Sequence, residues 1–158
     1  MFDLINGLPI HPLVVHAVVV LLPLATLGTI ALVVRPSWRR PYGPLLVAIA
    51  AVATVLIPVS TSSGEALEKR VGNPGEHAEL GDQLIWFALP MLVLLAALVW
   101  LDRRTPRSTD TGSRPSQAGS LKAVAVLALV AALATSVQVY RVGDSGARAA
   151  WGDQVSSG

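Results

Sequence analysis

The sequence predicts an all-α membrane protein, a bundle of four transmembrane helices. Four apolar runs lie at about residues 13–34, 45–63, 84–101 and 121–140. A hydrocarbon core of about 30 Å requires close to 20 helical residues, and each run is near that length. Composition agrees, since 53% of residues are hydrophobic and 14% charged, against about 25% charged in soluble domains. The short stretches between runs cannot bury cores of their own, so residues 1–158 are expected to form one domain.

Prolines, glycines and small polar residues predict where the helices begin and end. Pro12 suits the first turn of helix one, and Pro36 lies in the short connection to helix two. Helix two is expected to end in the Ser/Thr/Gly run 60–64. The Asn-Pro-Gly sequence at 73–75 predicts a turn before an amphipathic helix over 76–83, which leads into helix three.

The segment between helices three and four, residues 105–120, is rich in Ser, Thr, Gly, Pro and Arg. It has almost no apolar residue to bury, so we expect a flexible cytoplasmic linker. Small residues at helical spacing predict that helices two and four pack on each other. These residues are Ala50 and Thr54 in helix two and Ala128, Ala132 and Ser136 in helix four.

Basic residues predict the orientation, because cytoplasmic loops of membrane proteins accumulate Lys and Arg. Eight of the 12 Lys and Arg residues fall in the first and third loops: Arg35, Arg39, Arg40, Arg103, Arg104, Arg107, Arg114 and Lys122. Both termini are therefore expected on the outer side of a plasma membrane, together with most of the acidic residues.

Several function classes are disfavoured by the residues present. The absence of cysteine excludes disulfides, thiolate metal sites, covalent haem attachment and thiol catalysis. The basic residues form no patch interleaved with aromatics, so nucleic acid is not an expected partner. No nucleophile, base and orienting group stand out together, so an enzyme is the least supported class.

Three histidines carry whatever chemistry the chain has. His11 and His16 flank the outer start of helix one, and His77 lies just ahead of helix three. Imidazole ligates haem iron, zinc and copper. We take His16 and His77 as the expected cofactor ligands and His11 as an orienting or alternate one. Because the helix ends of a small bundle are close together, we also expect Glu65, Asp82 and Asp144 at this outer face.

Asp144 is the expected partner of His16. A carboxylate there can pair with a protonated imidazole or complete a mixed metal site with His11, His16 and His77.

The segment His11-Pro12-Leu13-Val14-Val15-His16 resembles the HPxxVH segment of a family of four-helix bacterial membrane proteins, domain of unknown function 2231. Residues 142–151 resemble the same family's GHxGG-like run after the last span and match its glycines. One departure is that Asp144 occupies the slot where that run usually has histidine. The resemblance implies a four-helix fold in the inner membrane of a bacterium and an association with haem or redox chemistry.

Two hypotheses for the function follow, and they belong to different classes. The favoured one is a non-catalytic membrane module without a cofactor, which binds the lipid bilayer and partner proteins and has a polar outer face containing the histidines. The alternative is a membrane redox module that binds haem b or a divalent metal through His16 and His77 and works with other redox proteins. The oligomeric state stays open.

Overall fold

The computed structural model describes residues 4–5, 8–72, 75–105 and 115–155. Its elements are β1 (Leu4–Ile5), β2 (Leu8–Pro9), α1 (Ile10–Val34), the 3-10 turn η1 (Pro36–Trp38), α2 (Arg39–Val71), α3 (Glu76–Gln83), α4 (Ile85–Arg104) and α5 (Pro115–Val155). The two short strands pair antiparallel ahead of α1. Within the described residues, four helical segments are long and apolar enough to span a membrane, with α3 and α4 counting as one. The predicted all-α four-helix fold is confirmed.

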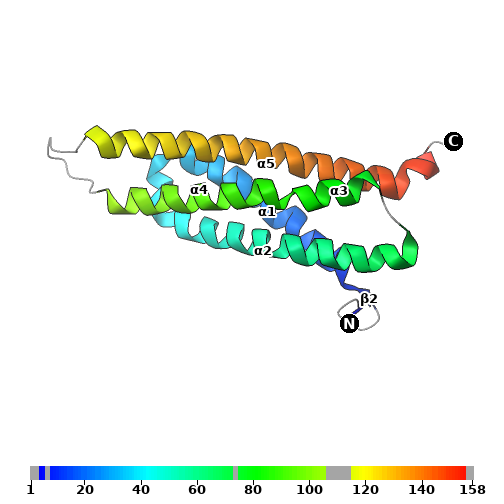
Figure 1. The fold of residues 1–158 in the computed structure, drawn as a ribbon. Coiled ribbons are helices and arrows are strands. Elements are labelled where there is room, and N and C mark those ends of the chain that lie inside the picture. Colours follow the sequence, from blue (N-terminus) through cyan, green and yellow to red (C-terminus); the bar gives the residue numbers. More distant parts are fainter. Residues whose placement is uncertain (1–3, 6–7, 73–74, 106–114, 156–158) are drawn as a thin grey trace.

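The helices form two antiparallel hairpins, α1 with α2 and α3/α4 with α5, which lie against each other (Figure 1). Both α1 and α4 pack on α2 and on α5. The predicted contact between the second and fourth spans is wrong, because α2 and α5 lie across the bundle from each other. Their buried alanines, such as Ala50 and Ala132, instead leave room at the centre for Leu22, Met91 and Leu95 from α1 and α4.

Two helices extend well beyond their apolar runs. The prediction that helix two ends at residues 60–64 is wrong, since α2 continues to Val71. The hydroxyls of Thr61 and Ser63 donate to carbonyls within the same helix, at 3.2 and 2.9 Å, so these residues do not break it. The helix ends at Gly72, whose φ of 94° disfavours other residues. The predicted helix over 76–83 is confirmed as α3.

The last helix is also longer than its apolar run. Because α5 begins at Pro115, the predicted linker 105–120 is too long at its carboxyl end. Proline is well suited to the first turn of a helix, since its missing N–H would have no partner there. Residues 106–114 lie outside the described part of the chain. At its other end α5 runs to Val155, so the glycines at 143 and 146 lie inside a helix.

A local break separates α3 from α4 and is repaired by a side chain of α5. The Leu84 N–H donates to the Gly81 carbonyl at 3.1 Å rather than to that of Leu80, as an α-helix requires. The buried Gln138 amide donates to the freed Leu80 carbonyl at 3.0 Å. This bond satisfies a buried carbonyl and fixes α3 against α5, which positions His77.

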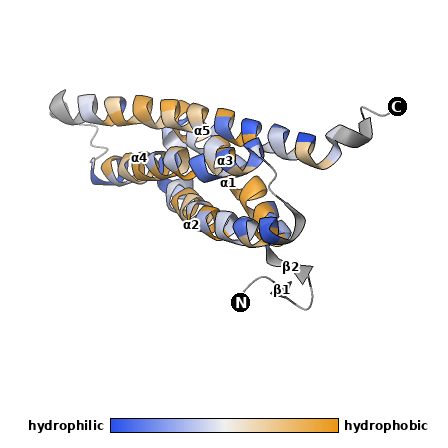
Figure 2. Ribbon diagram, turned by 45° about the vertical axis from the view of Figure 1, so that its right-hand side comes forward, coloured by the Kyte–Doolittle hydropathy of each residue, from blue (hydrophilic) through white to orange (hydrophobic). Residues whose placement is uncertain are grey.

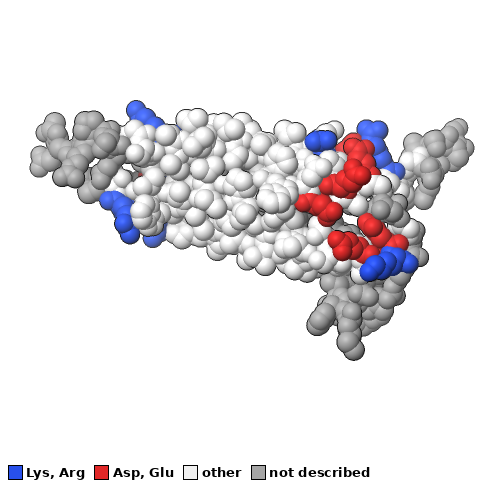
Figure 3. Space-filling model, viewed as in Figure 1, with Lys and Arg blue, Asp and Glu red and all other residues white. Residues whose placement is uncertain are grey.

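The middle of the bundle is apolar and hydrophilic residues lie toward its ends (Figure 2). Acidic side chains gather at one end, over α2 and α3, and Lys and Arg are the charged side chains visible at the other (Figure 3). We call the first the pocket end, where α1 begins, α2 ends and α3 begins. The second, where α1 passes through η1 into α2, is the arginine end.

A buried ionic cluster closes the arginine end. Asp102 of α4 is 8% exposed and Arg39 of α2 is 6% exposed. The Asp102 carboxylate lies 3.6 Å from guanidinium nitrogens of both Arg39 and Arg40. Arg39 also donates to the Leu32 carbonyl at 2.9 Å, and Arg40 to the Thr105 carbonyl at 2.7 Å. The cluster therefore ties the end of α1, the start of α2 and the end of α4 together.

Candidate functional site

A pocket of about 920 Å³ opens at the pocket end, lined by residues of α1, α2, α3 and α5. Its volume falls within the range of about 300–1,000 Å³ that is usual for ligand sites. Apolar side chains form its deeper walls: Val15, Val18, Val19, Ile57, Leu84 and Val139. All three histidines of the chain line it, together with Glu65, Glu68, Glu79 and Asp82.

His11 is held by the polar turn of α2. Its Nδ1 lies 2.9 Å from the Ser60 carbonyl oxygen and 3.2 Å from Ser63 Oγ. Because a carbonyl oxygen can only accept, Nδ1 carries the hydrogen and donates it. Ser63 Oγ donates its own hydrogen to the same carbonyl at 2.9 Å. The Nε2 lone pair of His11 is left without a hydrogen-bond partner among the described residues.

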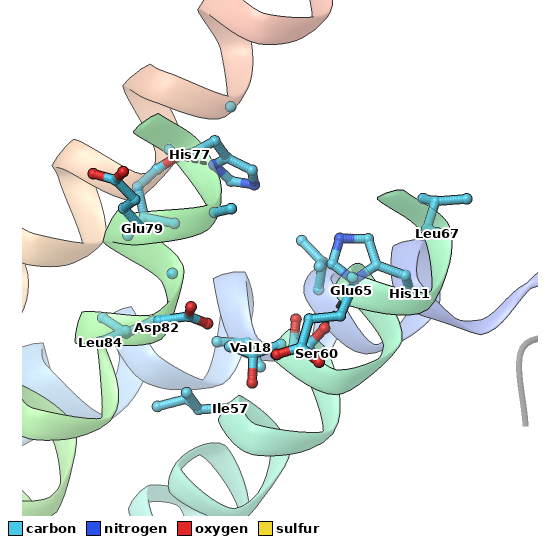
Figure 4. Close-up of a pocket in the computed structure, with 18 of the residues that line it drawn as sticks. His11, Val18, Ile57, Ser60, Glu65, Leu67, His77, Glu79, Asp82 and Leu84 are labelled. Carbon is cyan, nitrogen blue, oxygen red and sulfur yellow. Dashed lines mark hydrogen bonds between the residues drawn. The ribbon is translucent and has the colours of Figure 1, made fainter. Parts of the chain in front are cut away.

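His77 is held by α5 in the same way. Its Nδ1 lies 3.1 Å from the Val142 carbonyl oxygen and 3.3 Å from Ser145 Oγ, and Ser145 Oγ donates to that carbonyl at 3.0 Å. Both imidazoles therefore use Nδ1 on a carbonyl and a serine of the neighbouring helix. Figure 4 shows the two rings directed into the pocket from α1 and α3.

A glycine follows each of these serines and makes space for the ring. A Cβ atom added at Gly64 would lie 3.0 Å from Cε1 of His11, and one added at Gly146 would lie 3.0 Å from Cε1 of His77. Such contacts are tighter than ordinary packing allows, so any other residue would push the ring away. The sequence Ser-Gly is thus needed twice, once on α2 and once on α5.

His16 is held differently from the other two. It is exposed, and its Nδ1 donates to the carbonyl of Pro12 within its own helix. It lines the same pocket, deeper along α1. Among the described residues, no side chain of a neighbouring helix hydrogen-bonds to this ring, in contrast to His11 and His77.

Asp144 does not take the place that the sequence suggested. Its carboxylate pairs with Arg148 at 2.8 Å along α5, and it is not among the residues that line the pocket. No hydrogen bond or ion pair joins it to His16 in the part of the chain that the structure describes. Glu65 and Asp82, by contrast, line the pocket as expected.

The side chains do not gather into a chelating site. Among the described residues, no three His, Asp or Glu side chains are close enough together to hold a metal ion. The arrangement instead offers two separate imidazole nitrogens, His11 Nε2 and His77 Nε2, to a ligand that enters the pocket.

The serine and glycine pairs at 63–64 and 145–146 are the functional residues that sequence reasoning did not single out. Their signal is present, because the Ser-Gly dipeptide occurs in α2 and again in α5. It becomes informative only when each is known to face a histidine of the preceding span.

Comparison with known proteins agrees with this architecture. No curated protein and no solved structure gives a significant match to the chain. A family model described as "Predicted membrane protein (DUF2231)" matches residues 7–158 and so includes both hairpins and the whole pocket. The chain therefore belongs to the DUF2231 family of membrane proteins.

Proposed function

We propose that this protein is a membrane redox module whose pocket would hold haem b through His11 and His77. The main support for the proposal is that the His11 and His77 rings are held by equivalent hydrogen bonds, each to one carbonyl and one serine. Metal-bound histidines commonly donate their other ring N–H to a carbonyl or carboxylate, which sets the tautomer and the ring orientation. Both His11 and His77 have that second bond in place and direct Nε2 to the pocket.

The number of donors favours haem over a bare divalent metal. A zinc site needs three or four protein ligands, and no group of three is found among the described residues. A haem iron receives four nitrogens from its own macrocycle and needs only one or two axial side chains. The geometry also favours His11 over His16 as the partner of His77, because only His11 is fixed by a second helix.

The pocket has the surroundings that a haem site uses. Its deeper walls are apolar, while Gly81 and Gly143 line it at points where an added Cβ would meet nothing within 4 Å. When bound, haem supplies reversible one-electron chemistry at its iron. Among the residues whose side chains the structure describes, four carboxylates line the pocket and no Lys or Arg does. The negative charge of these carboxylates would stabilise the oxidised iron of a bound haem and so lower its reduction potential.

The module is proposed to sit in the bacterial plasma membrane with its pocket end outside. The support is the excess of Lys and Arg in the connections at the arginine end, including Arg35, Arg103 and Arg104. A reporter active only outside the cell is therefore expected to work when fused after Trp151 and to fail when fused between residues 107 and 117. The reverse pattern would place the pocket on the cytoplasmic side.

The proposal is tested by titrating haemin into the full-length protein purified in detergent. We expect saturation at one haem per chain, with a sharp low-spin spectrum in the reduced state, as two imidazole ligands produce. Zinc and copper, tested in parallel by elemental analysis, should not bind stoichiometrically. A bare spectrum after titration would refute the haem proposal and favour a cofactor-free module that binds partner proteins.

A further inference from the structure

The two hairpins repeat one pattern, residue by residue. Each of five buried positions in α1 has a buried counterpart the same number of residues further along the chain, at the end of α3 or in α4. The pairs are Val18 with Leu84, Leu22 with Ala88, Ala25 with Met91, Thr29 with Leu95 and Leu32 with Leu98. At that same separation, His11 corresponds to His77. The helix break near Leu84 does not disturb this register.

The second helices repeat in the same manner. Ala50 corresponds to Ala132, and both are fully buried. Thr54 donates to the Ala50 carbonyl at 2.7 Å, and its counterpart Ser136 donates to the Ala132 carbonyl at 2.9 Å. The same separation pairs the Ser-Gly of α2 with the Ser-Gly of α5. The pocket therefore lies between two equivalent halves, each contributing one fixed imidazole.

The repeat assigns Asp82 to the position of His16. Each follows its fixed histidine by five residues, on the helix that enters the bundle. Both are exposed and both line the pocket, and Figure 4 shows the Asp82 carboxylate directed toward its interior. At these matched places, the two halves supply two side chains that can each exchange a proton.

We propose that His16 and Asp82 are the proton-exchanging pair of this site, so that reduction of the bound cofactor is accompanied by proton uptake at the pair. The proposal rests on the proposed haem function. One electron from the donor, an electrode in the test below, adds one negative charge to the iron. A proton from a hydronium ion in the surrounding water then binds to Nε2 of His16 or to the Asp82 carboxylate and compensates that charge. An N–H or O–H bond forms as one O–H bond of the hydronium ion breaks, which leaves water.

Depth distinguishes this pair from the other titratable groups that face the pocket. Among the described residues, those are His11 on α1, Glu65 and Glu68 on α2, and His77 and Glu79 on α3, and the described lining residues of α5 are not titratable. A separation of five residues places His16 and Asp82 about 7.5 Å further along their helices than the fixed histidines. Apolar lining residues flank the pair in sequence, Val15 and Val18 beside His16 and Leu84 beside Asp82, so fewer polar groups there screen the charge on a bound iron.

The test measures the midpoint potential of the haem-loaded, full-length protein between about pH 5 and pH 8, the range in which histidine titrates. For one proton per electron, the potential should fall by up to about 59 mV per pH unit. His16→Gln and Asp82→Asn should each flatten part of this dependence, and the double variant most of it. The matched control Glu68→Gln, which removes another carboxylate that lines the pocket, should keep the slope of the unaltered protein.

The outcomes separate this inference from the function on which it rests. If the loaded protein shows its low-spin spectrum but a potential independent of pH, only the proton-exchanging pair is refuted. A double variant that binds haem and keeps the full slope refutes it as well. Failure of the unaltered protein to bind haemin overturns the proposed function and this inference together. Retention of the low-spin spectrum by each variant shows that it is folded.

Discussion

Substituting either His11 or His77 by alanine is expected to weaken haemin binding by more than about 100-fold, since loss of even a residue that orients a metal ligand typically costs 10-fold to 100-fold. The two variants should behave alike, because each ring is held by one carbonyl and one serine at nearly equal distances. His16→Ala should retain the low-spin spectrum and most of the affinity. Binding is measured by absorption titration of each purified variant.

Substitutions of the residues that position the His77 ring should weaken haemin binding less than loss of the histidine itself. Ser145→Ala removes one acceptor of the His77 N–H, and Gly146→Ala places a methyl group against the His77 ring. Each should weaken haemin binding by about 10-fold to 100-fold. Gly152→Ala is the matched control, because Gly152 has open space around it and lies outside the pocket lining.

Two results would contradict this assignment of ligands. One is a His16→Ala variant that loses as much affinity as His11→Ala, which would return His16 to the role that sequence analysis gave it. The other is normal binding by His77→Ala, since no other described histidine is fixed by α5.

The fold was predictable because lipid imposes a simple rule on sequence. Each span must satisfy its backbone within a helix and present apolar side chains, so the four apolar runs identified four helices directly. The ends of the helices were harder to predict from the sequence. The residue preferences of Ser60 to Gly64 predict a helix terminus. In the structure, the Ser63 hydroxyl instead donates to a carbonyl of the same helix, and Gly64 leaves space for the His11 ring. Tertiary contacts there override local preference.

The site was predictable as a set of residues but not as a geometry. The topology alone placed His11, His16 and His77 at one end, and all three line the pocket. Which two are equivalent depends on Ser63 and Ser145, whose contacts join residues far apart in the chain. Asp144 pairs instead with Arg148, which lies one helical turn away and offers it an opposite charge at 2.8 Å.

The ionic cluster at the arginine end was not predicted from the sequence, because its charged residues were used only to predict the orientation of the protein in the membrane. Arg39, Arg40 and Asp102 occupy loop borders, where basic residues are common in membrane proteins. The burial of Arg39 and Asp102 follows from the close approach of α2 and α4, with Gly43 packed against Val99. Charges that report topology can therefore also stabilise the bundle.

Asp102→Asn is expected to destabilise the folded protein by about 3–5 kcal/mol, the usual cost of removing one partner from a buried ion pair. The substitution preserves shape but leaves the guanidinium groups of Arg39 and Arg40 side by side without the carboxylate that lies 3.6 Å from each. Arg39 cannot turn toward water without giving up its bond to the Leu32 carbonyl. The free energy of unfolding is measured by tryptophan fluorescence in mixed micelles.

The control is Asp144→Asn, which removes an exposed ion pair and should leave stability nearly unchanged. Equal effects of the two substitutions would show that the Asp102 cluster contributes no more than a surface pair, and that apolar packing alone holds α1, α2 and α4 together at this end.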